Sequence, residues 1–210
     1  MNTDKWFDFC DAFCDCVARV RINEKWCIIN GNGENVNGVW YDNCGYFADG
    51  FCRVSYNGKY NLIDKNGKTI SDNWFDWCGC FTMGFSEIEV GEKWNVIDTE
   101  GKIRFKNWYD DCILLTTRGF CKVELNEKWN IIGVDGKLLS NVWFDLCEGF
   151  SNGFARVCQK HRYNFIDMHG RLLSNTWFDY CNEFDEGFAE VELDGKAYYI
   201  NKEGGLHEHR

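Results

Sequence analysis

Trp6-Phe7-Asp8-Phe9-Cys10 is the first of six copies of a short motif: an aromatic pair, an aspartate, any residue and a cysteine. The motif recurs from Trp40, Trp74, Trp108, Trp143 and Trp177, and by subtraction of these numbers the steps are 34, 34, 34, 35 and 34 residues. A fixed period in this range indicates a repeat architecture in which neighbouring units bury a shared core. The spacing, which leaves no room for a linker, predicts one domain of six units over residues 1–210.

Composition and charge narrow the class of protein. The chain has 210 residues, a formal net charge of −10 and no proline. Nucleic acids and anionic membranes attract clustered Lys and Arg, so this charge argues against both as partners. The sequence contains no run of about 18 apolar residues that could span a membrane, and the N-terminus lacks the apolar core of a signal peptide. We therefore expect a cytoplasmic protein that binds neither nucleic acid nor membrane.

Thirteen cysteines are present, and six of them occupy one position of the repeat. Disulfide frameworks usually have an even number, whereas a reduced cysteine packs as a small apolar side chain. We interpret the row as core thiols of a protein in a reducing compartment. The row consists of Cys10, Cys44, Cys78, Cys112, Cys147 and Cys181.

The second copy shows the expected elements of one repeat. A loop is expected over residues 44–47, and period-two alternation predicts a strand over residues 50–56. Asn57-Gly58 predicts a tight hairpin into a second strand over residues 59–64. After a turn at Gly67, a third strand is expected over residues 68–71. Each unit is therefore predicted to be three short antiparallel strands, and the fold to be all-β.

Three rows are nearly uniform across the copies: a glycine after the second strand, an isoleucine in that strand and an aliphatic residue in the first strand. Stacked units require such rows, because one unit cannot bury its apolar face alone. The rows are Gly33, Gly67, Gly101, Gly136, Gly170 and Gly204; Ile29, Ile63, Ile97, Ile132, Ile166 and Ile200; and Val20, Val54, Ile88, Val123, Val157 and Val191.

A variable charged row occupies the first strand, on the face opposite the valines. A row that is free to change charge is either solvated or shaped by a partner, so we predict that it forms a binding surface. The one-residue insertion in the loop 113–118 adds three consecutive apolar residues, Ile113, Leu114 and Leu115, as a predicted anchor. The charged row consists of Arg19, Arg53, Glu87, Lys122, Arg156 and Glu190.

The pattern Gly-Phe-Ala-x-Val, Gly-Lys-Tyr-Asn-x-Ile-Asp-x-x-Gly-Lys and Trp-Phe-Asp resembles the WG repeat family of bacterial proteins, also called KWG repeats, over residues 6–204. The resemblance implies an interaction module, and it carries over no catalytic residue set. One family glycine is replaced by asparagine in four copies. Asparagine tolerates left-handed backbone, so we expect it to keep the glycine geometry. These residues are Asn61, Asn95, Asn130 and Asn164.

Two architectures fit three strands per unit. An open β-solenoid or superhelical array is favoured, because propeller blades usually have four strands and about 40–45 residues. The alternative is a closed six-bladed ring, in which residues 4–10 would complete the unit that residues 187–204 leave unfinished.

Candidate catalytic and metal-binding residues are few. One aspartate per repeat does not supply the converging oxygen ligands of a Ca²⁺ site, so each is expected to accept backbone N–H groups in a turn. Cys10, Cys14 and Cys16 lack the second pair of a zinc site. The histidines have no positioned Cys or Ser partner, so we expect no metal, cofactor or catalytic residues. The aspartates are Asp8, Asp42, Asp76, Asp110, Asp145 and Asp179, and the histidines are His161, His169, His207 and His209.

The leading hypothesis is a non-enzymatic repeat scaffold that binds another protein in the cytoplasm. The alternative is a glycan or small-ligand binder that uses exposed Trp and Tyr, although a near-uniform aromatic row in alternating strands is more often core. A hydrolase that uses a free cysteine is a third class. The aromatic row consists of Trp26, Tyr60, Trp94, Trp129 and Tyr163.

Overall fold

The computed structural model describes residues 7–115 and 119–208, so Trp6, residues 116–118 of the inserted loop and His209 lie outside the described part. Over the described residues the backbone forms strands and turns and no helix. The chain divides into two compact units, Met1–Arg104 and Phe105–Arg210, and each carries three copies of the aromatic motif.

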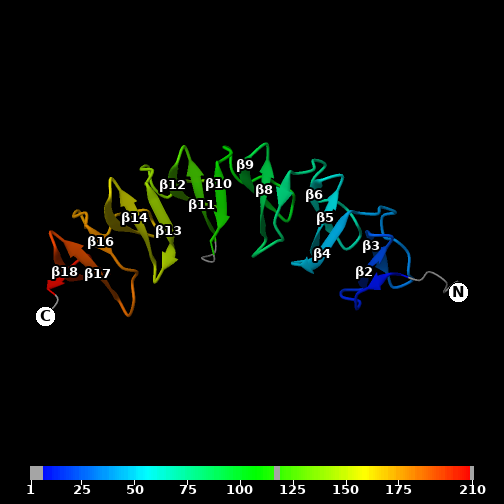
Figure 1. Ribbon diagram of the computed structural model, residues 1–210, viewed down its shortest axis with the longest axis horizontal. Helices are drawn as coiled ribbons and strands as arrows, with labels where there is room; N and C mark the ends of the chain where they lie inside the picture. The colour runs from blue at the N-terminus through cyan, green and yellow to red at the C-terminus, as the bar shows by residue number, and fades with distance from the viewer. Residues whose placement is uncertain (1–6, 116–118, 209–210) are drawn as a thin grey trace. The chain divides into compact units, whose positions relative to one another are not determined.

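Each repeat forms one antiparallel sheet, and the sheets of a unit follow one another in chain order (Figure 1). The strands of the first unit form three sheets: β1 (Phe9–Cys10), β2 (Val17–Ile22) and β3 (Lys25–Asn30); β4 (Asn43–Ala48), β5 (Phe51–Tyr56) and β6 (Lys59–Asp64); β7 (Trp77–Cys78), β8 (Phe85–Val90) and β9 (Lys93–Asp98).

The second unit repeats this order, and its last sheet has a fourth strand. Its sheets are β10 (Asp111–Leu114), β11 (Phe120–Leu125) and β12 (Lys128–Gly133); β13 (Leu146–Ser151), β14 (Phe154–Gln159) and β15 (Arg162–Asp167); β16 (Tyr180–Cys181), β17 (Phe188–Leu193), β18 (Lys196–Asn201) and β19 (Leu206–Glu208).

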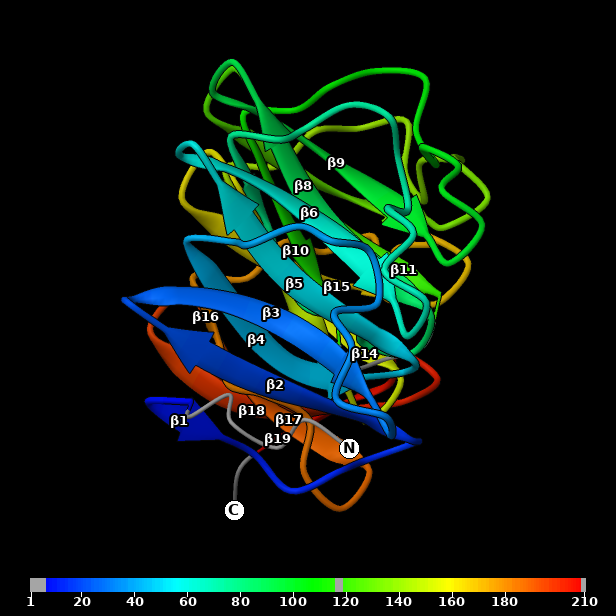
Figure 2. The same cartoon turned by 90° about the vertical axis from the view of Figure 1, so that its right-hand side faces the viewer.

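The all-β fold of antiparallel three-stranded repeats is confirmed, but one strand comes from a different segment than predicted. In the second sheet, β4 pairs with β5 and replaces the loop expected over residues 44–47. A β-bulge between Cys44 and Phe47 breaks the alternation that would have indicated a strand. The strand expected over residues 68–71 forms only an isolated bridge, between Ile63 and Thr69. Figure 2 shows β5 and β6 side by side in this sheet.

The two ends of the described chain are paired locally. Strand β1 pairs with β2 of its own repeat, so Phe9 and Cys10 complete the first sheet. Strand β19 pairs with β18, where Leu206 is opposite Ile200. The expectation that residues 4–10 complete the last sheet is therefore wrong for Phe9 and Cys10, because their backbone groups bond to Val20 and Arg21 instead.

The predicted core rows are confirmed: every isoleucine and aliphatic residue of the two rows is at most 4% exposed. We call the side of each sheet that carries the valine row its first face, and the side with the charged row its second face. Val17 and Ile28, on the second face of the first sheet, pack against Val54 and Ile63, on the first face of the next. The fifth and sixth sheets pack in the same way around Phe165. Sheets that stack within a unit therefore bury both faces.

The cysteine row is core in five copies, whereas Cys10 is exposed. All thirteen cysteines carry reduced thiols, and nine of them are buried. Cys44 and Cys52 lie in one cluster with their sulfur atoms 3.1 Å apart. Mutual hydrogen bonding and burial raise the pKa of Cys52.

The asparagines that replace the family glycine do not take a left-handed backbone, so that expectation is wrong. Asn164 is fully buried, and its Nδ2 donates to the main-chain oxygens of Ser174 and Thr176 at 2.8 and 3.1 Å. Asn61 and Asn130 make the equivalent pair of bonds. A side-chain amide thus holds the loop that leads to the next aromatic motif. Glycine could not make these hydrogen bonds, because it has no side-chain donor.

The aspartates of the aromatic motif accept backbone N–H groups, as predicted. The turn that donates these groups is not the next one in the chain, as expected, but the hairpin between the two long strands of the sheet. Asp145 Oδ2 accepts from the N–H of Lys160, in the hairpin of its own sheet, at 2.6 Å. Its Oδ1 pairs with Lys128 of the preceding sheet. Asp42 and Asp76 make the same two contacts. Each of these three aspartates therefore ties a hairpin to the previous repeat, and both of its carboxylate oxygens accept hydrogen bonds.

Candidate protein-interaction surface

The charged row lies on the second face, as alternation predicts, but it is not freely solvated. Arg19 is 6% exposed, and the other five members are partly buried. Of the two interpretations that the sequence left open, solvation therefore does not hold for Arg19. The physical reason is the stacking of sheets: within a unit, the second face of one sheet is the contact surface for the next.

Three arginines of the row link neighbouring sheets. Arg19 Nη1 donates to the main-chain oxygen of Cys44 at 2.6 Å, and Arg53 Nη1 donates to that of Cys78 at 3.2 Å. Arg156 makes the same bond to Cys181. Each bond spans 25 residues, from the first hairpin of one repeat to the cysteine of the next. Since these carbonyls have a charged donor, the bonds are of the stronger kind.

The arginines at the two ends of this pattern are also paired with carboxylates. Arg19 pairs with Asp11 and Arg156 with Glu148, in each case eight residues earlier in the same sheet. The hydrogen bonds with Glu148 raise the pKa of Arg156. Both guanidinium groups are therefore fixed in orientation by the sheet that carries them.

The aromatic row lies beneath these cations and is half-buried, whereas the sequence favoured a fully buried row. The Lys122 Nζ atom is 4.2 Å from the ring centroid of Trp129. Arg19 lies 5.3 Å from Trp26, and Arg156 is 5.9 Å from the Tyr163 ring. Because cations cover one side of these rings, the row offers less stacking surface than its composition indicates.

Glu87 and Glu190 break the cationic pattern, and each belongs to the third sheet of its unit. Glu190 accepts a hydrogen bond from Asn182 Nδ2 at 2.9 Å. Asn182 stands at the position of Glu148 in the fifth repeat, so the acid and its partner have exchanged roles. Glu190 lines two pockets at the last sheet.

The inserted loop divides between surface and core. Ile113 is 40% exposed and pairs with Lys122 across β10 and β11. Leu115 packs into the cluster around Phe144, so its predicted role as an exposed anchor is not supported by its position. Leu114 is half-buried.

The last sheet carries two pockets that the sequence did not predict. One has a volume of about 500 Å³ and contains two aromatic rings and four carboxylates. It is lined by Asn182, Glu183, Asp185, Glu186, Phe188, Glu190, Tyr199 and His207. We call it the acidic aromatic pocket.

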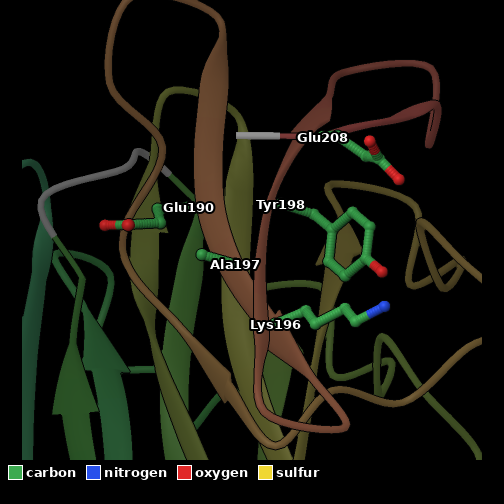
Figure 3. A pocket seen from close by; sticks show the side chains of 5 residues that line it. All are labelled: Glu190, Lys196, Ala197, Tyr198 and Glu208. Atoms are coloured by element: carbon green, nitrogen blue, oxygen red, sulfur yellow. The ribbon is translucent and has the colours of Figure 1, made fainter. Parts of the chain in front are cut away.

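The other pocket, of about 530 Å³, lies at the edge of β18 and is shown in Figure 3. Ala197 and Glu190 point to one side of the sheet, and Lys196, Tyr198 and Glu208 point to the other. Ala197 stands where the other repeats have Trp or Tyr. Ala197 was the visible signal for this pocket, because its small side chain replaces a large ring of the other repeats.

Three buried cysteines of the row are poorly suited to act as nucleophiles. Burial raises the pKa of Cys78, Cys147 and Cys181 to about 12, which opposes formation of a nucleophilic thiolate. Over residues 7–115 and 119–208, no group of three His, Cys, Asp or Glu side chains is placed to hold a metal ion. The same part of the chain contains no membrane-spanning helix.

The WG containing repeat model matches residues 28–60, 62–94, 135–163 and 165–196. The chain belongs to the WG-containing repeat family. Three polar or thiol side chains recur at fixed positions in the repeats of this chain: a cysteine, an aspartate and a buried asparagine. Each of them contacts the core or a neighbouring turn. No curated protein sequence matches the chain.

Solved structures resemble this WG repeat chain only distantly. Hsv2 of Kluyveromyces lactis is 9% identical with a TM-score of 0.41, over 89% of this chain and 71% of that one. A eukaryotic initiation factor is 11% identical with a TM-score of 0.47, over 91% and 61%. A protein of unknown function from Bacteroides caccae is 13% identical with a TM-score of 0.27, over 87% and 88%. All three scores are below 0.5, so these likenesses support no argument about function.

Proposed function

We propose that this WG repeat chain is a non-enzymatic scaffold that binds another protein in the cytoplasm. The observation that carries the proposal is the uncovered second face of the last sheet. There, Phe188 is 47% exposed and Tyr199 is 36% exposed. In the fifth sheet the residue equivalent to Tyr199 is Phe165, which is 1% exposed because it packs into the cluster of the sixth sheet. In the fifth sheet, the sixth sheet therefore covers the equivalent face.

Exposed aromatic rings beside charged groups favour a protein partner. Large rings in a concave site dominate the binding free energy of many protein interfaces, and a polar rim then sets specificity. The acidic aromatic pocket has both components, with Phe188 and Tyr199 among its walls and Glu183 and Glu186 at its exposed margin. Its volume of about 500 Å³ is sufficient for a side chain and part of the backbone that carries it.

The predicted binding role of the charged row and of Ile113, Leu114 and Leu115 stays a prediction. The geometry changes how it must be tested. Reversing the charge of Arg53 or Arg156 would also break a bond between sheets, so lost binding would not identify a contact surface. Glu190 can be reversed without removing such a bond.

The test compares three forms of the chain as bait: the natural sequence, the double variant Glu190→Lys with Tyr199→Ser, and Tyr56→Ser as a control. Tyr56 is an exposed tyrosine, at 44%, in the second sheet. We expect the natural chain and the control to capture the same protein, and the double variant to lose it. The captured protein, once purified, should rebind the natural chain at a fixed stoichiometry.

Two results would overturn the proposal. Either no captured protein rebinds in purified form, or the purified partner binds the double variant as tightly as the natural chain. Circular dichroism of the variants ensures that lost binding is not lost folding. Fractionation of cells that make the protein tests the cytoplasmic location separately.

A further inference from the structure

One aromatic contact recurs between stacked sheets. The residue three positions after the row cysteine is a phenylalanine in most repeats, and its ring packs on the first residue of the central strand in the preceding sheet. The ring centroids are 4.8 Å apart for Phe51 and Phe81 and 4.7 Å apart for Phe154 and Phe184. Within each unit, the second face of a sheet therefore binds an aromatic side chain of the next sheet. We call this binding position the seat.

The seat on the fifth sheet shows how the ring is held. Phe154 and Phe165 contact the Phe184 ring at centroid distances of 4.7 and 4.9 Å. Asn152 Nδ2 donates to the main-chain oxygen of Phe184 at 2.6 Å, and Arg156 donates to that of Cys181, three residues earlier. Two rings thus hold the side chain, and two donors hold the backbone that carries it.

The sixth sheet keeps the rings and replaces the donors. Thirty-four residues on, Phe154 and Phe165 correspond to Phe188 and Tyr199, whereas Asn152 and Arg156 correspond to Glu186 and Glu190. All four of these residues line the acidic aromatic pocket. A carboxylate cannot donate to a carbonyl oxygen, so this seat lacks both donors with which the fifth sheet holds the Phe184 segment.

Two further substitutions change the charge in the same direction. Gly149 and Ser151 of the fifth repeat correspond to Glu183 and Asp185, which also line the pocket. No Lys or Arg is among the lining residues, and His207 is the one basic side chain there, with its ring edge-on to Phe188 at 6.4 Å. The pocket is therefore an aromatic seat surrounded by hydrogen-bond acceptors of negative charge.

We infer that the acidic aromatic pocket binds an aromatic side chain of a partner protein, carried on a segment with Lys or Arg on both sides of the ring. The ring takes the place that Phe184 has on the fifth sheet. The cations pair with Glu186 and Glu190, where the fifth sheet has donors. This inference rests on the proposed function and names the chemistry of its partner.

Charge argues against a second copy of this chain as the occupant. Phe13 holds the position of Phe184 in the first repeat and is 52% exposed, so its ring could enter the pocket. Its segment, however, carries Asp11 and Asp15 where the pocket requires cations. With a net charge of −10, two copies also repel each other at long range.

The probe is a short fluorescein-labelled peptide of glycine and serine with one phenylalanine between two arginines. Fluorescence anisotropy should show saturable binding that weakens as the salt concentration rises above ~0.15 M. Replacing the phenylalanine of the peptide with glycine, or Phe188→Ala in the protein, should lower the affinity about tenfold, because the stacked pair is lost. A peptide with glutamates in place of the arginines should not bind.

The sharpest variant restores the two donors of the fifth repeat. Glu186→Asn with Glu190→Arg should reduce the preference for the arginine peptide, whereas Glu183 and Asp185 keep the pocket unfavourable for the glutamate peptide. Glu203→Arg is the control, because it changes the charge by as much as Glu190→Arg and lies in the turn between β18 and β19, outside the pocket. These charge variants keep the test decisive if Phe188→Ala does not fold.

Three outcomes would overturn the inference. The glycine peptide binds as tightly as the phenylalanine peptide, the double reversion leaves the preference unchanged, or the chain self-associates in sedimentation and Phe13→Ser dissolves the oligomer. If the peptide fails while a purified partner still rebinds the natural chain, the inference fails and the proposed function stands. If both fail, the proposed function is overturned as well.

Discussion

Arg156 in β14 donates a hydrogen bond to the main-chain oxygen of Cys181 in the next sheet, and its own sheet fixes it through Glu148. The side chain therefore acts as a link between repeats and not as a solvated charge. Equivalent links join Arg19 to Cys44 and Arg53 to Cys78. We expect this link to contribute to the free energy of unfolding.

Arg156→Met should lower the free energy of unfolding by about 2 kcal/mol, because a charged hydrogen bond is lost and Glu148 loses its partner. Urea unfolding followed by circular dichroism measures the change. Arg171→Met is the control: Arg171 pairs with Asp167 but its side chain is 75% exposed, so its loss should be within about 0.5 kcal/mol. Equal effects of the two substitutions would contradict a linking role for Arg156.

The aspartate contacts predict a dependence on acid. The hydrogen bond from Lys128, together with the N–H of Lys160, lowers the pKa of Asp145, and the same arrangement lowers the pKa of Asp42 and Asp76. A depressed pKa in the folded state stabilises the protein above the ordinary Asp value of about 3.9. This stability is lost as the pH falls through the lower, folded-state pKa.

Asp145→Asn should therefore lower the urea midpoint at neutral pH, and the difference from the natural chain should shrink below about pH 3.9. Glu203→Gln, in an exposed turn, should leave the midpoint unchanged at both pH values. A difference that persists at low pH would show that the carboxylate charge is not the stabilising element.

The turn glycines pack closely on the preceding repeat. A Cβ on Gly170, which has φ of +76°, would lie 1.8 Å from the main-chain oxygen of Leu139. Gly195 has a similar φ of +73° and open space around it. Gly195→Ala should cost about 1–2 kcal/mol for the left-handed backbone alone. Gly170→Ala should be more destabilising by about 1–3 kcal/mol, because the backbones must separate.

The contrast between these two variants is the measurement. Thermal melting of both proteins, followed by circular dichroism, reports it directly. Equal losses of stability would mean that Gly170 is needed only for its backbone conformation, and that the sheets can move apart without penalty.

Cysteine labelling should separate two classes of thiol. Cys10, Cys14, Cys16 and Cys80 are exposed and the other nine are buried. Iodoacetamide on the native protein, followed by mass spectrometry, should modify the four exposed thiols first. In urea all thirteen should react. Rapid native labelling of Cys147 would contradict its burial and its raised pKa.

Much of the fold could be predicted from the spacing of residues. The two long strands of each sheet follow from alternation, and Asn57-Gly58 marks the turn between them in the second copy. The valine and isoleucine rows form the core. The first strand of the second sheet could not be predicted, because the bulge between Cys44 and Phe47 removes its alternation. The segment 68–71 bonds to β6 through the main-chain oxygen of Lys68 and the N–H of Ile70. The side chains of Asp64 and Asn61 bind the N–H of Lys68 and the main-chain oxygen of Ser71, so its strand pairing is limited to one bridge.

The location of the charged row was predicted, but its environment was not. The variation in charge left open a row that is exposed to solvent, whereas the stacking of sheets within a unit places it between neighbouring sheets. One sequence signal pointed to this: the residue before each row isoleucine is also apolar, which indicates strands that are buried on both faces. Leu62, Ile131 and Phe165 are such residues, and each is at most 1% exposed.

The aromatic pocket required both sequence and structure. Glu183, Glu186 and Glu190 are visible as departures of the sixth copy from the fifth. Only the packing of Phe184 on Phe154 and Phe165 shows that these departures surround a seat for a ring. A comparison of repeats within one chain therefore identifies what a change means once the contacts of the unchanged copy are known.

The pairing of one sheet's second face with the first face of its successor has an implication for how such proteins diversify. A copy whose second face holds no neighbouring sheet can alter that face without disturbing one that must dock there. Such a copy can therefore acquire a new specificity while the stacked faces of the others stay unchanged. An engineer could exploit the same freedom by grafting one closing repeat onto an otherwise unaltered stack.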